Sequence, residues 1–209
     1  MTDHDLSKPD IRKANDCPPL PVNANMLDRT VYWLGIGLGS GLPRRAPGTW
    51  GTAGGLIVGV PLISLGFIPF LALTILSCLV GVWICGRTSD LMQVHDDPHI
   101  VWDEWAGMWI TLLPLSYIFS YVFPTPEDPL LMLLQPMFWG WLPTAFILFR
   151  VFDILKPPPI GWADKKVAGG LGVMLDDIIA GVMAAVVWLV IFISVMTFVP
   201  DSLPLLIPQ

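Results

Sequence analysis

Long apolar stretches without a charged residue alternate along this chain with short polar segments. Charged side chains are absent from four stretches: residues 46–86, 105–126, 129–149 and 178–200. A helix needs about 20 apolar residues to cross the hydrocarbon core of a bilayer, so each of the last three stretches predicts one membrane-spanning helix. The first stretch is about twice that length and contains Pro61, Gly66 and Pro69, which interrupt helices. It therefore predicts a hairpin of two helices that turns near residues 65–69.

The composition strengthens the assignment to a membrane protein. Hydrophobic residues make up 54% of the 209 positions, charged residues only 13%, and the mean hydropathy is +0.67. A soluble domain usually carries about 25% charged residues. We therefore expect an all-α polytopic membrane protein with about five apolar helices, the first of them short. Residues 30–209 are expected to form one membrane-embedded domain. Residues 1–29 are polar and rich in proline, which predicts a flexible cytoplasmic tail without the apolar segment of a signal sequence.

The distribution of lysine and arginine predicts how the chain is oriented. With the hairpin in place, every Lys and Arg falls on one face of the membrane. If the first stretch were a single span, Arg44 and Arg45 would lie opposite Arg87 and this segregation would be lost. The positive-inside rule then predicts that the amino terminus and the polar loops are cytoplasmic, whatever the net charge of -6. No pattern of basic residues indicates nucleic-acid binding, and the sequence does not indicate an oligomeric state.

Two acidic pairs lie where apolar runs begin, Asp103–Glu104 and Asp176–Asp177. A carboxylate at the centre of a bilayer costs about 2.5 to 3.5 kcal/mol, so acids belong at the membrane surface or in a site that uses them. Helix capping is the simpler alternative, because acids at a helix start complement the helix dipole. Capping accounts for one acid of each pair more readily than for two.

Small residues follow both pairs at a spacing of four, which places them on one helix face. They form the series Asp103, Gly107, Thr111 and the series Asp177, Gly181, Ala185. Small residues at this spacing let membrane helices approach closely, so the two faces are expected to meet and to bring their carboxylates together. Like charges at close range repel unless a cation or proton lies between them. All four acids are therefore candidate ligands of one or two Mg²⁺ ions, which prefer carboxylate oxygens.

Further polar residues on the same face predict a phosphate site beside the metal. Arg150, Asp153 and Lys156 end an apolar run before three prolines. Arg150 and Lys156 either complement the helix end or bind a phosphate, with Asp153 orienting Arg150 or reaching the metal. The glycine-rich segment 39–52, which includes Thr49, could also cradle phosphate, although the nucleotide-binding glycine motifs are absent.

One polar loop adds a candidate for proton transfer. His95 precedes Asp96 in the loop before the first acidic pair. A histidine there can donate a proton or bind a metal, because its ordinary pKa lies near neutrality, and solvation in a polar loop is the alternative.

Five motifs in this order resemble the phosphatidylglycerophosphatase A family of bacteria. They are Gly39-Ser40-Gly41-Leu42, Pro47-Gly48-Thr49-x-Gly51, His95-Asp96 with Ile100-Val101-Trp102-Asp103-Glu104, Arg150-x-x-Asp153-x-x-Lys156-Pro157, and Gly169-Gly170-x-Gly172-x-Met174-x-Asp176-Asp177. The resemblance implies an Mg²⁺-dependent enzyme of the bacterial inner membrane. Its substrate would be a membrane phospholipid, phosphatidylglycerophosphate, which it would convert to phosphatidylglycerol and phosphate.

The implied mechanism assigns a role to each candidate residue but leaves two routes open. Asp103, Glu104, Asp176 and Asp177 are expected to hold the metal, Arg150, Lys156 and Thr49 the phosphate, and His95, Asp96 and Asp153 to act in catalysis. Either water attacks the phosphorus directly or one of the acids forms an aspartyl-phosphate. A cation or proton transporter that uses carboxylates at the membrane surface is the alternative function.

Overall fold

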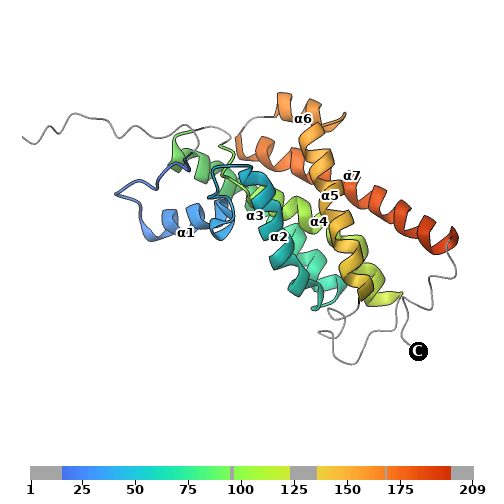
Figure 1. Cartoon of the computed structure of the whole chain (residues 1–209). Coiled ribbons are helices and arrows are strands. Elements are labelled where there is room, and N and C mark those ends of the chain that lie inside the picture. Colours follow the sequence, from blue (N-terminus) through green and yellow to red (C-terminus); the bar gives the residue numbers. More distant parts are fainter. Residues whose placement is uncertain (1–15, 95–96, 123–135, 168, 199–209) are drawn as a thin grey trace, which may run out of the picture.

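The computed structural model describes residues 16–94, 97–122, 136–167 and 169–198, and this part of the chain is helical without strands (Figure 1). The elements in order are α1 (Met26–Gly35), the 3-10 turn η1 (Gly37–Gly39), α2 (Pro47–Ile63), α3 (Phe67–Met92), α4 (Trp102–Tyr121), α5 (Pro136–Leu155), α6 (Ile160–Lys166) and α7 (Gly169–Phe198). The predicted all-α class is confirmed.

The long first stretch forms two helices, α2 and α3, with a break close to the predicted position. Residues 64–66 separate them, and Gly66 has a φ of 91°, which glycine adopts without a steric penalty. Pro69 lies in the first turn of α3, where a missing backbone N–H is harmless. The break therefore lies just before Pro69 and not around it.

Helix α4 forms the centre of the molecule. It packs against α2, α3, α5 and α7, and most of its side chains are buried (Figure 1). Trp105 and Trp109 fill the space beside α2, because Gly55 and Gly59 there leave room for indole rings. The Nε1 of Trp109 donates a hydrogen bond of 2.8 Å to the carbonyl of Gly55, so the ring is satisfied where it is buried.

The most extensive helix contact joins α4 to α7 along the small residues that the sequence singled out. A Cβ atom added to Gly181 would lie 2.5 Å from the carbonyl oxygen of Gly107, so the two backbones meet at this point. Oγ1 of Thr111 donates a hydrogen bond of 3.0 Å to the carbonyl of Gly107 in its own helix. Close approach of the two predicted faces is thus present in the structure.

Within the described part of the chain, two helices, α3 and α7, are long and apolar enough to cross a membrane. Helices α2, α4 and α5 occupy the other predicted apolar stretches. That they also span the bilayer, and that their loops are cytoplasmic, stays a prediction.

Two helix starts differ from what the sequence indicated. Helix α7 begins at Gly169, so Asp176 and Asp177 lie two turns inside it and not in its first turn. The uncharged residues before them are helical because Gly170 packs closely against the backbone of α3 at Val82 and Gly86. Capping of a helix terminus therefore does not account for this acidic pair.

At the amino-terminal end, α1 begins within the segment that was expected to be a flexible tail. Asn25 accepts a hydrogen bond from the backbone N–H of Asp28, and Asp28 accepts one in return, which forms a capping box. Asp28 also binds Arg87 of α3 through an ion pair of 2.6 Å. The helix thus starts at Met26, inside the predicted segment 1–29.

Candidate active site

Asp103 and Glu104 lie in the first turn of α4, where that helix enters the core. The backbone N–H of Val101, the residue before the helix, donates a hydrogen bond of 2.8 Å to the carbonyl of Gly35. This bond fixes the start of the helix. Both carboxylates are buried, with 9% of each residue exposed. Two adjacent acids thus enter the interior together at the amino-terminal end of one helix.

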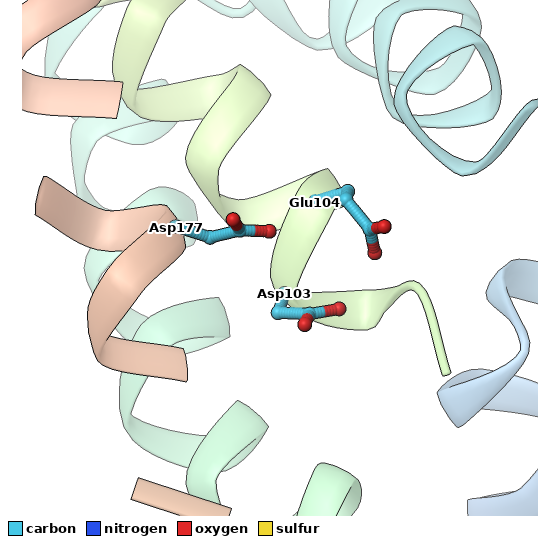
Figure 2. A group of neighbouring side chains, drawn as sticks. All are labelled: Asp103, Glu104 and Asp177. Atoms are coloured by element: carbon cyan, nitrogen blue, oxygen red, sulfur yellow. The ribbon is translucent and has the colours of Figure 1, made fainter. Parts of the chain in front are cut away.

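Asp177 reaches the same place from α7 and is 3% exposed. One carboxylate oxygen from each of Asp103, Glu104 and Asp177 lies within 4.8 Å of the other two. Figure 2 shows Asp177 extending from its helix toward the first turn of α4. The contact between Gly107 and Gly181, one turn further along both helices, makes this approach possible. We refer to these three residues as the carboxylate cluster.

Two oxygens of the carboxylate cluster have no hydrogen-bond donor among the described residues. They are Oδ1 of Asp103 and Oε2 of Glu104, and both are buried. A buried carboxylate oxygen without a donor is unfavourable, and three like charges at this range add repulsion. A divalent cation coordinated by these oxygens removes both costs, so the donor set fits a hard cation such as Mg²⁺.

Asp176, the fourth predicted ligand, lies outside the carboxylate cluster. Its Oδ2 forms an ion pair of 2.6 Å with Nζ of Lys156. Its Oδ1 accepts a hydrogen bond of 3.2 Å from the backbone N–H of Asp177. The structure therefore joins Lys156, which follows α5, to the helix that carries Asp177.

Arg150 lies near the end of α5 and is held from two sides. Its Nη1 forms an ion pair of 2.5 Å with Asp153. The same nitrogen donates a hydrogen bond of 3.3 Å to Oγ1 of Thr52. The Nε of Arg150 is buried and has no acceptor among the described residues. Asp153 in turn lies beside Asp177, so the guanidinium group is tied to the carboxylate cluster through one carboxylate.

Helix α2 contributes two residues of the segment 39–52 to which the sequence analysis gave no individual role. A Cβ atom at Gly48 would lie 2.5 Å from Oε1 of Glu104 and 3.3 Å from Nη1 of Arg150, so this glycine leaves the space in which the two charged groups sit. Thr52, one turn later, accepts the hydrogen bond from Arg150. Thr49, the predicted phosphate ligand, lies between them and is half-buried. The spacing of four between Gly48 and Thr52 was the signal that could have identified them.

Comparison with known proteins identifies the family to which this arrangement belongs. A family model described as phosphatidylglycerophosphatase A matches residues 33–192. The chain belongs to the phosphatidylglycerophosphatase A family. The matched residues include the whole carboxylate cluster as well as Arg150 and Lys156, so the site lies entirely within the family domain.

Relatives in three bacteria extend this result. The chain is 40% identical to the phosphatidylglycerophosphatase A of Haemophilus influenzae, over 80% of this chain and 91% of that protein. It is 38% identical to the protein of the same name in Escherichia coli, over 74% of this chain and 78% of that protein. A protein of Bacteroides thetaiotaomicron that is provisionally named a phosphatidylinositol-3-phosphatase is 34% identical, over 71% of this chain and 85% of that protein. No solved structure matches the chain.

The loop before α4 of this family member holds the remaining candidates. His95 and Asp96, the predicted proton carriers, lie outside the described residues. Next to them, Nδ1 of the buried His99 lies 2.7 Å from Oδ1 of Asp97. The sequence analysis did not select this pair, although its Asp-x-His spacing was visible. The pair orders the loop that leads into Asp103.

Proposed function

We propose that this protein removes the terminal phosphate from phosphatidylglycerophosphate and releases phosphatidylglycerol and inorganic phosphate. Membership of the phosphatidylglycerophosphatase A family supports the substrate and the reaction. The observation that carries the chemistry is the carboxylate cluster, with Arg150 and Lys156 beside it. Acids that bind a cation and cations that bind a phosphate are the two parts that a phosphomonoester hydrolase needs.

Asp103, Glu104 and Asp177 would hold Mg²⁺ in this proposal. The two buried oxygens without donors support this assignment. Bound Mg²⁺ would polarise the phosphoryl group and lower the pKa of a coordinated water. Asp176 is proposed to hold Lys156 in place through their ion pair and not to bind the metal itself.

Arg150 and Lys156 would bind the phosphoryl oxygens. Asp153 and Thr52 fix one end of the guanidinium group, which restricts its orientation before a substrate arrives. Its other N–H groups suit the planar contacts that arginine makes with phosphate. The positive charges of both side chains would offset the negative charge that develops on the phosphoryl oxygens. Thr49, beside Gly48 on α2, is proposed as a further phosphate contact.

Proton transfer is assigned to the loop before α4 and to Asp153. The reaction breaks the bond between phosphorus and the glycerol oxygen, and that oxygen gains a proton as the alcohol leaves. His95 or Asp96 would supply this proton, and Asp153, beside Asp177, would accept one from the attacking water. Trapping with fluoroberyllate tests for an aspartyl-phosphate route, because fluoroberyllate bonded to a nucleophilic aspartate mimics the phosphorylated carboxylate.

The protein is proposed to act at the cytoplasmic face of the bacterial inner membrane. The segregation of Lys and Arg in the sequence and the two long apolar helices support this location. A lipid substrate then reaches the site from the same leaflet without leaving the bilayer.

Phosphate release from defined lipids tests the proposed reaction. The purified protein is assayed in detergent micelles with phosphatidylglycerophosphate, phosphatidic acid and phosphatidylinositol 3-phosphate at equal surface concentration. We expect kcat/KM for phosphatidylglycerophosphate to exceed that for the other two by at least about tenfold, the discrimination that a few polar headgroup contacts provide. Preference for the inositol lipid would contradict the proposal and would favour the activity named for the Bacteroides relative.

A further inference from the structure

Helix α1, at one edge of the molecule, has an exposed apolar side that faces away from α3 (Figure 1). Its other side is buried against α3 and carries Asp28 and Val31. On the exposed side, Met26 is 81% exposed and Trp33 is 48% exposed. These two residues share one side of the helix with Thr30, because the three are spaced by four and three. Large apolar side chains that are exposed together indicate a surface for a partner or a membrane.

The exposed apolar side continues past the end of α1. Leu38 and Leu42 are both exposed. A Cβ atom added to Gly39 would lie 3.5 Å from Cδ1 of Leu42 and 3.7 Å from Cζ3 of Trp33, so both side chains lie beside this glycine. We refer to the exposed apolar residues of this segment as the α1 surface, which consists of Met26, Leu27, Trp33, Leu38 and Leu42.

Contacts with α3 fix the level of α1 along that helix. Asp28 forms its ion pair with Arg87, and Oγ1 of Thr88 donates a hydrogen bond of 3.3 Å to the carbonyl of Val31. Arg87 lies about 20 residues after Phe67, the first residue of α3, which corresponds to about 30 Å along the helix. The hydrocarbon core of a bilayer is also about 30 Å thick. Helix α1 therefore lies at the level where a spanning α3 leaves the hydrocarbon core.

The contact with α1 also lies on the exposed side of α3. Leu76, Val80 and Trp83 are exposed apolar residues of α3, and Arg87 follows them on the same side of the helix at a spacing of four, three and four. The exposed apolar side of a membrane-spanning helix contacts lipid. Helix α1 thus crosses α3 at the end of its lipid-facing side.

The side chains on and beside the α1 surface are of the kinds that occur at a membrane surface. Tryptophan is enriched at the level of the lipid headgroups, because its ring is apolar and carries one polar N–H. Arg29 lies at the edge of the exposed side of α1, Arg45 follows the α1 surface, and both are exposed. Neither forms an ion pair with an acid in the described part of the chain. Arginine in such a position lays its apolar stem along lipid and directs its charge to the phosphates.

We propose that α1 is an interfacial helix whose α1 surface inserts into the cytoplasmic leaflet of the bilayer. This inference rests on the orientation given in the proposed function and not on the proposed reaction. An interfacial helix buries its apolar side about 5 to 10 Å into the boundary between headgroups and acyl chains. Insertion removes the exposed apolar side chains from water, which is the favourable contribution to binding.

Insertion of the α1 surface also fixes the depth of the carboxylate cluster, because the same segment holds the start of α4. The carbonyl of Gly35, at the end of α1, accepts the hydrogen bond from Val101. Nε1 of Trp105 donates a hydrogen bond of 3.2 Å to Oγ of Ser40. Val101 and Trp105 flank the two acids of α4 in the sequence. The α1 surface is thus a second anchor, besides the spanning helices, for the position of these acids relative to the lipid headgroups.

Electron paramagnetic resonance of a nitroxide label on α1 tests this placement without turnover. The label is attached to Thr30→Cys, a change that removes no apolar side chain from the α1 surface, in a protein whose other cysteines are replaced by serine or alanine. The protein is reconstituted in vesicles of phosphatidylcholine and phosphatidylglycerol. We expect oxygen, which concentrates in hydrocarbon, to relax the label more than a water-soluble nickel chelate does, with an immersion depth of about 5 to 10 Å. A label on Asp90→Cys, an exposed position one turn beyond Arg87, should respond more to the nickel chelate.

Two exposed tryptophans provide matched variants. Trp33→Gln should reduce the immersion depth of the label on Thr30→Cys by at least about half, because it removes the largest side chain of the α1 surface. Trp162→Gln in α6, which is not part of the α1 surface, should leave this depth unchanged.

Two results would overturn the inference. One is a label on Thr30→Cys that responds to the nickel chelate as the label on Asp90→Cys does, even in a protein that hydrolyses phosphatidylglycerophosphate. The other is a label that is shielded from both reagents and shows dipolar coupling to a second label, because the α1 surface would then be a contact between copies. An inactive protein with an immersed label would instead contradict the proposed reaction and support the placement of α1.

Discussion

At the scale of single residues, the site combines charges that are costly to bury with neighbours that compensate only some of them. Lys156 neutralises Asp176, and Arg150 neutralises Asp153. In the carboxylate cluster, by contrast, two oxygens have no donor among the described residues. The protein without a metal therefore carries an electrostatic penalty at this point, which a bound cation would relieve.

Mg²⁺ should therefore stabilise the folded protein through the carboxylate cluster. A ligand at about 100 times its Kd raises the free energy of unfolding by about 2.7 kcal/mol, which is visible as a rise in Tm. We expect this rise for the wild-type protein in detergent and its loss in Asp177→Asn. Asp90→Asn, which changes an exposed acid near the end of α3, should respond to Mg²⁺ like the wild type. An equal response of Asp177→Asn would place the cation elsewhere.

Gly48 should be needed for activity because a methyl group there collides with the charged groups of the site. The added Cβ would lie 2.5 Å from Oε1 of Glu104, so the carboxylate must move. Gly48→Ala is expected to lower kcat at least about tenfold, because displacement of a catalytic group by a fraction of an ångström costs this much. Gly140→Ala in α5 is the control, since nothing lies within 4 Å of the added atom. Equal kcat values for the two variants would show that Glu104 does not need its observed position.

The charged residues of the candidate site could be predicted from the sequence. A residue whose role is to leave room for other side chains could not. Asp103, Glu104 and Asp177 were visible as acids beside apolar runs. Gly48 was included only as part of the segment 39–52, and its closeness to Glu104 and Arg150 was not foreseen, because those residues are distant from it in the sequence. Asp176 was grouped with the other acids, since the sequence contains no sign that Lys156 reaches it.

At the scale of helices, the geometry of the site depends on how closely α4 and α7 approach. The closest point is the Gly107–Gly181 contact, one turn from the acids. Thr111 also lies 3.4 Å from the carbonyl of Gly181, which adds a polar contact between the two helices. Any increase in the separation of the helices would move Asp177 away from Asp103 and Glu104.

Gly181→Ala should therefore destabilise the protein and reduce its activity together. The added Cβ meets the backbone oxygen of Gly107 at 2.5 Å, and a backbone cannot rotate away as a side chain can. Overpacking of this kind costs about 1 to 3 kcal/mol. Gly86→Ala in α3, where the nearest atom would be at an ordinary 3.6 Å, should not lower the Tm. Thermal melting of the two variants in the same detergent provides the comparison.

The helical class could be predicted from the apolar stretches, whereas the short helices α1 and α6 were not expected from the sequence. The break between α2 and α3 was expected near residues 65–69, and the structure has it at residues 64–66, beside Gly66. The start of α7 was placed too late, because the sequence argument counted from the last charge. Glycines 169, 170 and 172 are poor helix formers alone, and tertiary packing against α3 keeps this turn helical.

At the scale of the whole molecule, the proposed orientation places the carboxylate cluster and the ends of α3 and α5 on the cytoplasmic side. The turn between α2 and α3 then lies on the opposite side, because α3 is long enough to cross the bilayer. This orientation follows from the positive-inside rule.

Cysteine labelling tests this orientation. In a protein whose Cys17, Cys78 and Cys85 are replaced by serine or alanine, Leu65→Cys in the turn and Trp162→Cys in α6 are both well exposed. An impermeant maleimide added to spheroplasts should label Leu65→Cys at least about tenfold more than Trp162→Cys, and lysis should make the labelling equal, because a charged reagent does not cross the hydrocarbon core. Labelling of both positions before lysis would contradict the hairpin topology.

The central claim is that Asp103, Glu104 and Asp177 together form the cation site of a lipid phosphatase. The most direct test is phosphate release from phosphatidylglycerophosphate by EDTA-treated protein during a titration with Mg²⁺, for the wild type, Asp177→Asn and Asp90→Asn. The account predicts no release before Mg²⁺ is added, saturable recovery in the wild type and Asp90→Asn, and a kcat at least about 100-fold lower in Asp177→Asn. Full activity in EDTA, or wild-type activity of Asp177→Asn, would contradict it.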